Sequence, residues 1–351
     1  MKYPYLLSLV LALVSCKKPV KISTTAYIIG TNDITTFEPM AESLPFEGLS
    51  HSSALITVPM DNGQLKFCSG SLIEGETPQS APRVITNHHC FTQDIEEKTQ
   101  ASTGLVENHC KGAKVFLGFL KADIENKEVR RCRLGSFRSD SILDLATFEL
   151  DQTPDQRFSP LTLADPSQLE SREGAVIIHY PKIDESDPEL KSKVHMDLDT
   201  QIPLPFAQIT SRDCHTLGPF PPEEWALDLS LGFGIKHSCD QLKGSSGSAL
   251  INRTTGHLLG VNWGGIKIGY GGDRGEMVVN VATASPYVAM FLEGDVDEVK
   301  KEVDAIAQNP PKPSSDPSRC GSISASAPMP GFWLLALSPC LILALRKDTL
   351  S

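Results

Sequence analysis

Three short segments carry side chains that could act together in nucleophilic catalysis. Residues 86–90, with the sequence TNHHC, contain His89, and a second segment begins with Asp144. Residues 244–248, with the sequence GSSGS, contain Ser246. A lone histidine or a lone glycine–serine run occurs by chance in a chain of 351 residues, so neither is informative alone. A base, an acid and a hydroxyl in this order, each in its own flanking sequence, favour a serine hydrolase.

The chemistry of these residue types suggests a role for each side chain. A serine hydroxyl at its free pKa is a weak nucleophile and needs a base to take its proton. A neutral histidine can accept that proton, and a buried carboxylate on the other ring nitrogen selects the required tautomer. We therefore predict Ser246 as nucleophile, His89 as base and Asp144 as the orienting acid.

Short strands are expected to position these segments. Between Tyr27 and about Pro286 the chain consists of short apolar or alternating runs, such as 53–58, 84–86 and 175–178. Gly, Pro, Asn and Asp separate these runs. Regularly recurring strands with turn residues between them indicate an all-β barrel or sandwich.

A different composition follows the strands. The sequence predicts an amphipathic helix over 293–309, whose apolar residues at helical spacing are Val296, Val299, Val303 and Ile306. Residues 310–330, rich in Pro, Ser and Ala, indicate an extended linker. Residues 331–351 form an apolar tail with a basic end, which resembles a bacterial C-terminal sorting signal. A marginal membrane anchor or an unstructured apolar tail are alternative interpretations.

The first residues, 1–16, favour export. Lys2 is followed by an apolar run over 5–14 that is too short to span a bilayer. The run ends in the sequence LVSC, which resembles the lipobox of bacterial lipoproteins and makes Cys16 the expected lipidated residue. An ordinary secretory signal with a chance cysteine is the alternative. We expect an envelope lipoprotein, or a secreted protein after processing.

Nine cysteines in an exported chain should mostly be paired. Cys16 is set aside for lipid and Cys340 because it lies in the apolar tail. Order along the chain suggests the pairs Cys68–Cys90, Cys110–Cys132 and Cys214–Cys239, with Cys320 left over in the linker.

The net charge and the spacing of histidine and cysteine residues argue against two kinds of partner, nucleic acids and metal ions. A net charge of −11 without a basic stripe disfavours nucleic acid. His88, His89 and Cys90 do not indicate a metal site, because adjacent strand residues point to opposite faces. We expect a monomer that acts on protein or peptide substrates without a metal or cofactor, with membrane contact through Cys16 and the tail.

Five motifs in order resemble those of the chymotrypsin-fold serine proteases, and most closely the bacterial glutamyl endopeptidases. They are FCSGSLI at 67–73, VITNHHC at 84–90, ILDLATFEL at 142–150, CDQLKGSSGS at 239–248 and GVNWGG at 260–265. The resemblance covers roughly Tyr27 to Leu292. It implies two perpendicular Greek-key β-barrels, over 27–155 and 156–292, with the active site in the cleft between them.

The resemblance also implies binding roles. Gly244 and Ser246 would donate backbone N–H groups to the oxyanion. The residues expected to line the substrate site are Asp240, Gln241, Asn262, Trp263 and Gly264, with His237 as a further candidate.

Three positions depart from the family pattern or leave alternatives. Ser245 stands where many animal members carry an aspartate that pairs with a freed N-terminus, so that activation switch is not expected. Asn262 replaces the histidine by which glutamyl endopeptidases bind a substrate carboxylate, which argues against Glu specificity. Asp240 either selects Arg and Lys substrates or has a structural hydrogen-bonding role.

Two further alternatives concern activity and maturation. A catalytically inactive protease fold kept for binding is the alternative to a working enzyme. Residues 27–30 resemble the mature start of related enzymes, so cleavage near Ile28 or Ile29 would compete with retention of the lipid anchor.

Overall fold

The computed structural model describes residues 27–36, 49–75, 80–92, 110–120, 127–169, 172–182, 195–196, 203–205, 207–210, 213–220, 229–269, 276–295, 297–299, 301 and 305. The predicted leader with Cys16, the linker and the apolar tail lie outside these residues.

The first sheet carries the histidine and aspartate segments. Its seven antiparallel strands follow the order β6-β5-β2-β3-β4-β8-β7. They are β2 (Ser53–Pro59), β3 (Leu65–Ile73), β4 (Arg83–Thr86), β5 (Lys114–Leu117), β6 (Glu128–Arg131), β7 (Arg138–Asp140) and β8 (Leu145–Glu149). An antiparallel bridge between Cys132 and Leu150 joins the ends of β6 and β8, so the sheet closes on itself.

The second sheet carries the serine segment. Its eight strands follow the order β1-β12-β9-β15-β16-β17-β14-β13. They are β1 (Thr35–Thr36), β9 (Ala175–His179), β12 (Gln208–Thr210), β13 (Thr216–Pro219), β14 (Gly234–His237), β15 (Ala249–Asn252), β16 (Leu258–Gly269) and β17 (Glu276–Ala284). A bridge between Gly174 and His215 brings β9 to β13 and closes this sheet as well. A separate pair consists of β10 (His195–Met196) and β11 (Pro203–Leu204).

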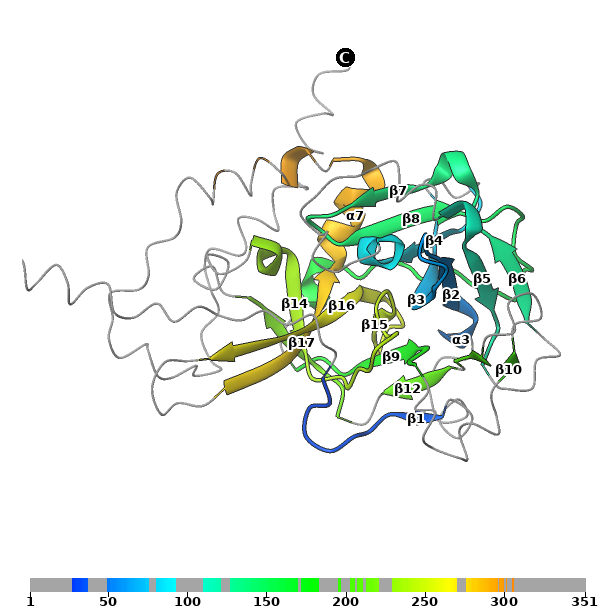
Figure 1. The fold of residues 1–351 in the computed structure, drawn as a ribbon. Helices are drawn as coiled ribbons and strands as arrows, with labels where there is room; N and C mark the ends of the chain where they lie inside the picture. The colour runs from blue at the N-terminus through cyan, green and yellow to red at the C-terminus, as the bar shows by residue number, and fades with distance from the viewer. Residues whose placement is uncertain are drawn as a thin grey trace, which may run out of the picture. The chain divides into compact units, whose positions relative to one another are not determined.

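One hydrophobic cluster contains residues of both sheets. β2 and β9 are buried almost throughout, which explains their continuous apolar runs. Leu55 of β2 and Ile178 of β9 belong to the same buried cluster. Figure 1 shows the strands of the first sheet beside those of the second. The predicted all-β fold of two barrels is confirmed.

The N-terminal segment belongs to the second barrel, which corrects the predicted boundary. The sequence placed residues from Tyr27 onward in the first barrel. Instead, β1 pairs with β12, with Thr35 opposite Ile209. No local pattern in a two-residue strand specifies such a distant partner, so only the folded chain shows it.

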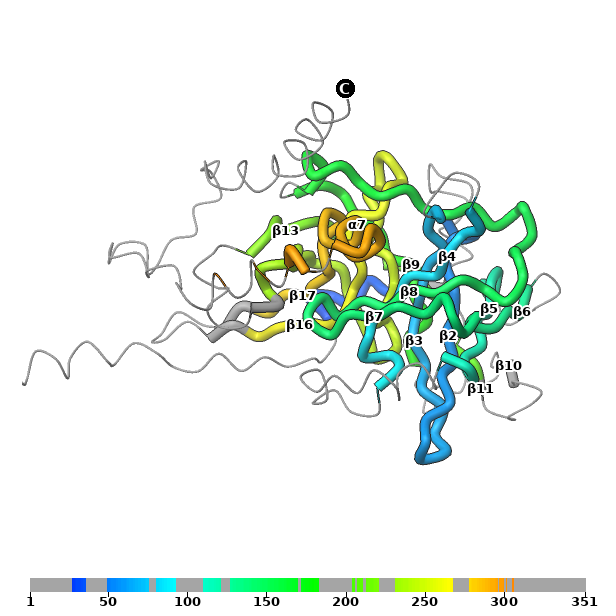
Figure 2. Tube along the Cα trace, turned by 90° about the horizontal axis from the view of Figure 1, so that it is seen from above, coloured from blue at the N-terminus to red at the C-terminus, as the bar shows by residue number. Residues whose placement is uncertain are grey.

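The helices are short and one was not predicted. α7 (Ser285–Glu293) has a proline in its first turn, ends at Gly294 with φ 85°, and contacts β8, β16 and β17. It is the orange helix labelled in Figure 2. Pro286 marks the predicted end of the strand region, and in the structure it lies in the first turn of this helix, where a proline is tolerated. Residues 297–299, 301 and 305 of the predicted 293–309 helix are helical, and its other residues after 295 are not described.

The remaining helical turns are α3 (Leu49–Ser52) and the 3-10 turns η1 (His88–Phe91), η3 (Leu134–Ser136), η4 (Pro166–Gln168) and η5 (Leu229–Phe233). Among the described residues, no helix has the length and apolar character needed to cross a membrane.

Three disulfide bonds cross-link segments of the described chain. They join Cys68 to Cys90, Cys110 to Cys132 and Cys214 to Cys239. These are the pairs expected from chain order. Disulfides persist in oxidising compartments, so they indicate an exported protein.

Candidate active site

His89 lies on a short turn that several contacts hold in place. η1 begins two residues after the end of β4, and the Cys68–Cys90 disulfide ties it to β3. The side-chain amide of Asn87 donates to the backbone carbonyl of Asp144 at 2.9 Å. The turn that carries the histidine is therefore fixed to the segment that carries the aspartate.

Asp144 binds His89 through both carboxylate oxygens. Oδ2 lies 2.7 Å from the imidazole Nδ1, and Oδ1 accepts the backbone N–H of His89 at 2.9 Å. The two residues are 4% and 7% exposed. Because the carboxylate accepts the Nδ1 proton, Nε2 is left as the acceptor that a general base needs.

The backbone of Asp144 adopts an unusual conformation to make this contact. Its φ is 52°, in the left-handed region that side chains other than glycine rarely occupy. Such a conformation costs about 1–3 kcal/mol and persists only where neighbouring contacts compensate. The bonds from Asn87 and His89 supply that compensation.

The serine segment is a tight loop before β15 that depends on two glycines. Gly244 and Gly247 have φ values of 100° and 86°. A Cβ atom on Gly247 would lie 2.1 Å from both the Ser69 carbonyl oxygen and Thr86 Oγ1. The loop therefore packs directly against β3 and the end of β4, three residues before His89.

The backbone amides of this loop divide into two groups. Ser245 N donates to Leu242 O at 3.0 Å, and Ser248 N donates to Ser245 O at 3.0 Å. Gly247 N donates to Asn262 O at 2.7 Å. Within the described residues, the N–H groups of Gly244 and Ser246 donate to no protein acceptor. These two amides are the predicted oxyanion donors.

Ser69 joins the serine loop to the first barrel, and the sequence analysis did not identify it. Its N–H donates to Ser246 O at 2.8 Å, and its hydroxyl donates to Gly244 O at 2.9 Å. The same hydroxyl accepts Tyr180 N, and Thr86 Oγ1 donates to Ser69 O at 2.7 Å. The only sequence signal was the place of Ser69 within the FCSGSLI motif.

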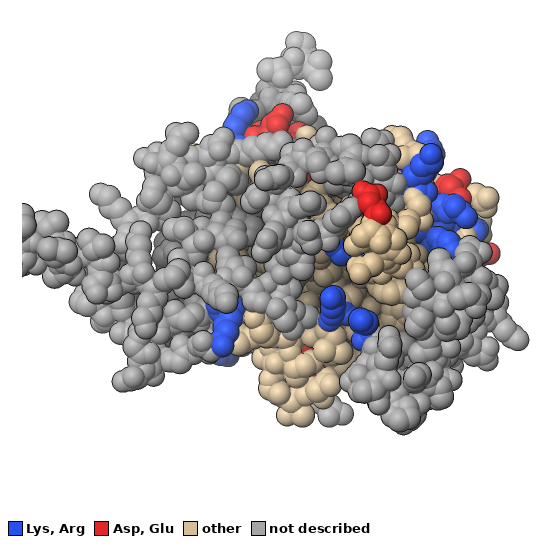
Figure 3. Space-filling model, viewed as in Figure 1, with Lys and Arg blue, Asp and Glu red and all other residues tan. Residues whose placement is uncertain are grey.

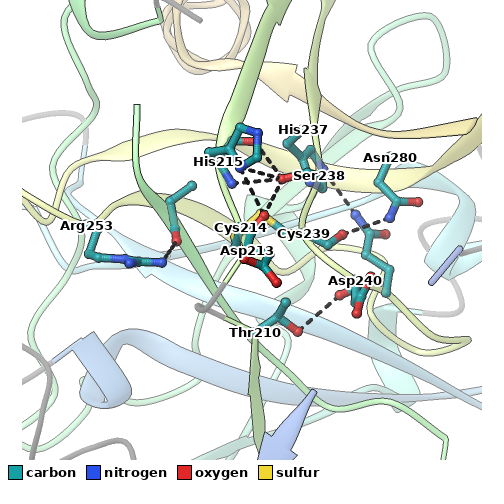
Figure 4. Close-up of a disulfide and its surroundings, with 12 residues drawn as sticks. Thr210, Asp213, Cys214, His215, His237, Ser238, Cys239, Asp240, Arg253 and Asn280 are labelled. Atoms are coloured by element: carbon teal, nitrogen blue, oxygen red, sulfur yellow. Dashed lines mark hydrogen bonds between the residues drawn. A yellow bond between two sulfur atoms is a disulfide. The ribbon is translucent and has the colours of Figure 1, made fainter. Parts of the chain in front are cut away.

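Asp240 binds the N-terminal segment. Its carboxylate accepts the backbone N–H groups of Ile29 at 2.6 Å and Asp33 at 2.9 Å, and the residue is 1% exposed. Figure 4 shows Thr210 donating to the Asp240 carbonyl, at 3.1 Å. Burial raises the pKa of Asp240, the two amides lower it, and the Asp33 carboxylate raises it further. This geometry favours the structural role over an open pocket for Arg or Lys.

Gln241 and Asn262 form a buried amide network behind the serine loop. Gln241 Nε2 donates to Asn262 Oδ1 at 3.1 Å and lies 3.1 Å from His237 Nε2. Asn262 Nδ2 donates to Ser248 Oγ at 2.8 Å. Burial lowers the pKa of His237 to about 3, so its imidazole is neutral. The network joins the predicted binding residues to the loop.

Trp263 departs from its predicted role. The irregular pairing of β16 with β17 between Asn262 and Gly264 sets Trp263 apart from the ladder. Its side chain is 3% exposed and packs in a buried cluster with Phe220 and Ile266. The indole is therefore a core residue rather than an open wall for substrate.

Some of the described basic side chains lie beside acidic ones, as at the upper right of the face in Figure 3. Arg133 pairs with Glu149 at 2.8 Å, and Arg130 pairs with Glu128. Within the described ranges, His, Cys, Asp and Glu side chains do not gather in groups of three that could hold a metal ion.

Comparison with known proteins gives a family. The chain resembles a solved structure of a Glu endopeptidase in complex with MPD, with 16% identity and a TM-score of 0.47 over 77% of this chain and 100% of that chain. It also resembles HL collagenase, with 14% identity and a TM-score of 0.45 over 72% of this chain and 96% of that chain. A third similar structure is that of GrC, with 12% identity and a TM-score of 0.44 over 72% of this chain and 98% of that chain. No curated protein sequence matches. Residues 68–261, more than half of the chain, match the family described as Trypsin-like peptidase domain. The chain belongs to the trypsin-like peptidase family.

Proposed function

We propose that the protein is a serine endopeptidase that cleaves peptide bonds through an acyl-enzyme. The observation that carries the proposal is the pattern of loop amides: within the described chain the N–H groups of Gly244 and Ser246 meet no protein acceptor while their neighbours do, as an oxyanion site requires. The buried His89–Asp144 pair supplies the proton acceptor that Ser246 needs.

The proposed reaction proceeds in these steps. Ser246 Oγ attacks the scissile carbonyl carbon while its proton passes to His89 Nε2, and the carbonyl oxygen becomes an oxyanion facing the two amides. Asp144 stabilises the imidazolium that forms. His89 then protonates the leaving amine as the tetrahedral intermediate collapses to an ester of Ser246. A water molecule repeats the sequence and releases the acid.

The test is covalent labelling with a fluorophosphonate, which phosphonylates an activated serine. Intact-mass spectrometry of the wild-type protein should show one adduct, and a Ser246→Ala variant should show none. Peptidase activity on a mixed peptide library should disappear in the same variant. An unlabelled, correctly folded wild-type protein, or an active Ser246→Ala variant, would contradict the proposal. The first result would favour the inactive binding fold.

We also propose that Cys16 is lipidated and tethers the exported enzyme to the bacterial envelope. The lipobox-like LVSC sequence and the disulfide-stapled barrels support this location. Expression of the full chain should give a membrane-bound protein whose N-terminal peptide carries acyl groups. Cys16→Ser should release the protein or leave its leader uncut; a wild-type protein without acyl groups would contradict the proposal.

Maturation by cleavage near Ile28 is less compatible with the contacts of Tyr27. The Tyr27 N–H donates to Asn280 Oδ1 at 3.3 Å, and its carbonyl accepts from Asn280 Nδ2 at 2.9 Å and Gln241 N at 3.1 Å. We therefore propose that the active enzyme retains Tyr27. N-terminal analysis of the fraction labelled by fluorophosphonate tests this, and a mature start at Ile28 or Ile29 would contradict it.

A further inference from the structure

A serine–histidine pair lies buried beside the serine loop and has no part in the steps above. Ser245, which precedes Ser246, is 1% exposed, and His179, the last residue of β9, is fully buried. Ser245 Oγ and His179 Nδ1 lie 2.6 Å apart although 66 positions separate the residues. This contact joins the loop to the strand next to β15.

The hydrogen bonds around the pair fix which atom donates. Thr210 Oγ1 donates its hydrogen to Asp240 O at 3.1 Å, so it can only accept from His179 Nε2, which lies 3.4 Å away. The proton of the neutral imidazole is then on Nε2, and Nδ1 accepts from the Ser245 hydroxyl. Burial lowers the pKa of His179 to about 3, which keeps this imidazole neutral at physiological pH.

Ser245 is the residue between the two oxyanion donors. Its N–H and its carbonyl oxygen bond Leu242 and Ser248, each at 3.0 Å. Its hydroxyl oxygen accepts the Leu242 N–H at 3.1 Å. With the hydroxyl hydrogen given to His179, each polar group of Ser245 is used to hold the loop. The Ser245 carbonyl and the Ser246 N–H belong to one planar peptide unit, so the bond from Ser248 N to Ser245 O also sets the direction of the Ser246 N–H.

We propose that His179 and Ser245 are positioning residues, which hold the N–H groups of Gly244 and Ser246 in the orientation that an oxyanion requires. This inference rests on the proposed peptidase function and deepens it. The contact between Ser245 and His179 joins two side chains of the second barrel and does not involve the amino group of the N-terminus. The oxyanion site is therefore formed in the folded chain whatever the position of its mature N-terminus.

The test compares variants that remove the contact with one that preserves part of it. Ser245→Ala and His179→Leu remove it. His179→Asn keeps a polar atom near the Nδ1 position and loses the Thr210 contact. The matched control is Ser238→Ala, since Ser238 Oγ also lies 2.9 Å from a histidine Nδ1, that of His215, beside the Cys214–Cys239 disulfide (Figure 4).

Two measurements are made on each variant, the steady-state constants for a peptide substrate and amide hydrogen exchange of residues 242–248. Loss of orientation in one oxyanion donor should lower kcat about tenfold to a hundredfold and change KM by less than about threefold. Exchange in the loop should rise about tenfold. His179→Asn should recover most of both values, and Ser238→Ala should match the wild type.

The two measurements separate this inference from the proposed function. Unchanged loop exchange in both Ser245→Ala and His179→Leu would overturn the positioning role whether or not the protein is an enzyme. Unchanged kcat with faster exchange would overturn the link to catalysis. If the wild-type protein does not react with fluorophosphonate but the two variants exchange faster in the loop, the peptidase proposal is refuted and the positioning role stands.

Discussion

The Lys66 ammonium group donates hydrogen bonds to the backbone carbonyl oxygens of His89 and Thr92, the latter at 3.0 Å. The His89 carbonyl also accepts from Thr92 Oγ1 at 3.1 Å. Lys66 lies on β3, directly before the segment FCSGSLI at 67–73 that contains Ser69. The Lys66 ammonium group therefore holds the backbone carbonyls of the histidine turn, and Asp144 holds the His89 side chain.

Lys66→Met should lower kcat about threefold to tenfold, because the turn that carries His89 loses a charge-assisted hydrogen bond. Lys66→Arg keeps the charge and the donors and should retain most of the activity. Steady-state kinetics with the same peptide measure both effects. Equal kcat values for the wild-type protein and Lys66→Met would show that this contact is not needed to position the base.

Asp144→Asn tests the orienting acid. An amide cannot accept from Nδ1 and His89 N as the carboxylate does, so the histidine loses its required tautomer, and kcat should fall about 10³- to 10⁴-fold. Asp140→Asn is the matched control, since Asp140 lies in the same barrel and its Oδ1 also accepts backbone N–H groups, those of Ile142 and Leu143, at 2.9 Å each. A similar loss in both variants would point to a folding defect rather than to catalysis.

The buried histidines predict acid sensitivity of the fold. Burial lowers the pKa values of His179 and His237 from 6.5 to about 3. Between these values the unfolded chain binds protons that the folded protein does not. The free energy of unfolding should therefore decrease as pH falls below 6.5, by up to about 1.4 kcal/mol per pH unit for each histidine, and be constant above it.

Urea unfolding at about pH 7 and about pH 5 measures this effect. His237→Gln should reduce the difference between the free energies of unfolding at the two pH values. An equal pH dependence in the wild-type protein and His237→Gln would contradict the assignment of a neutral buried imidazole.

Residues that lie in a short characteristic motif could be predicted from the local sequence. Contacts between residues far apart in the chain could not. The histidine, aspartate and serine segments and the cysteine pairs were accessible because each has a characteristic neighbourhood. Asp240 was ambiguous because its partners, Ile29 and Asp33, lie 211 and 207 positions away. The burial of Trp263 could not be predicted because a motif does not show which face of an irregular strand a side chain occupies.

Asp240→Asn separates the structural role of this residue from a specificity role. The amide of asparagine would place a donor against the N–H of Ile29 or Asp33, so residues 27–36 should detach from the barrel. Limited proteolysis should then cut this segment about tenfold faster. The ratio of kcat/KM for Arg, Lys and Glu peptides should not change, and selective loss of Arg and Lys cleavage would instead assign Asp240 to substrate binding.

Gly247→Ala should abolish activity and destabilise the fold, since its Cβ would meet Ser69 O and Thr86 Oγ1 at 2.1 Å. Gly63→Ala is the matched control, because Gly63 has a similar φ of +77° and no atom within 4 Å of an added Cβ. The control bears only the backbone cost, about 1 kcal/mol. Gly247→Ala also forces apart the serine loop and β3, so its loss of unfolding free energy should be at least about 2 kcal/mol larger. Thermal or urea unfolding of both variants measures the difference, and equal losses would show that the loop and β3 do not pack this closely.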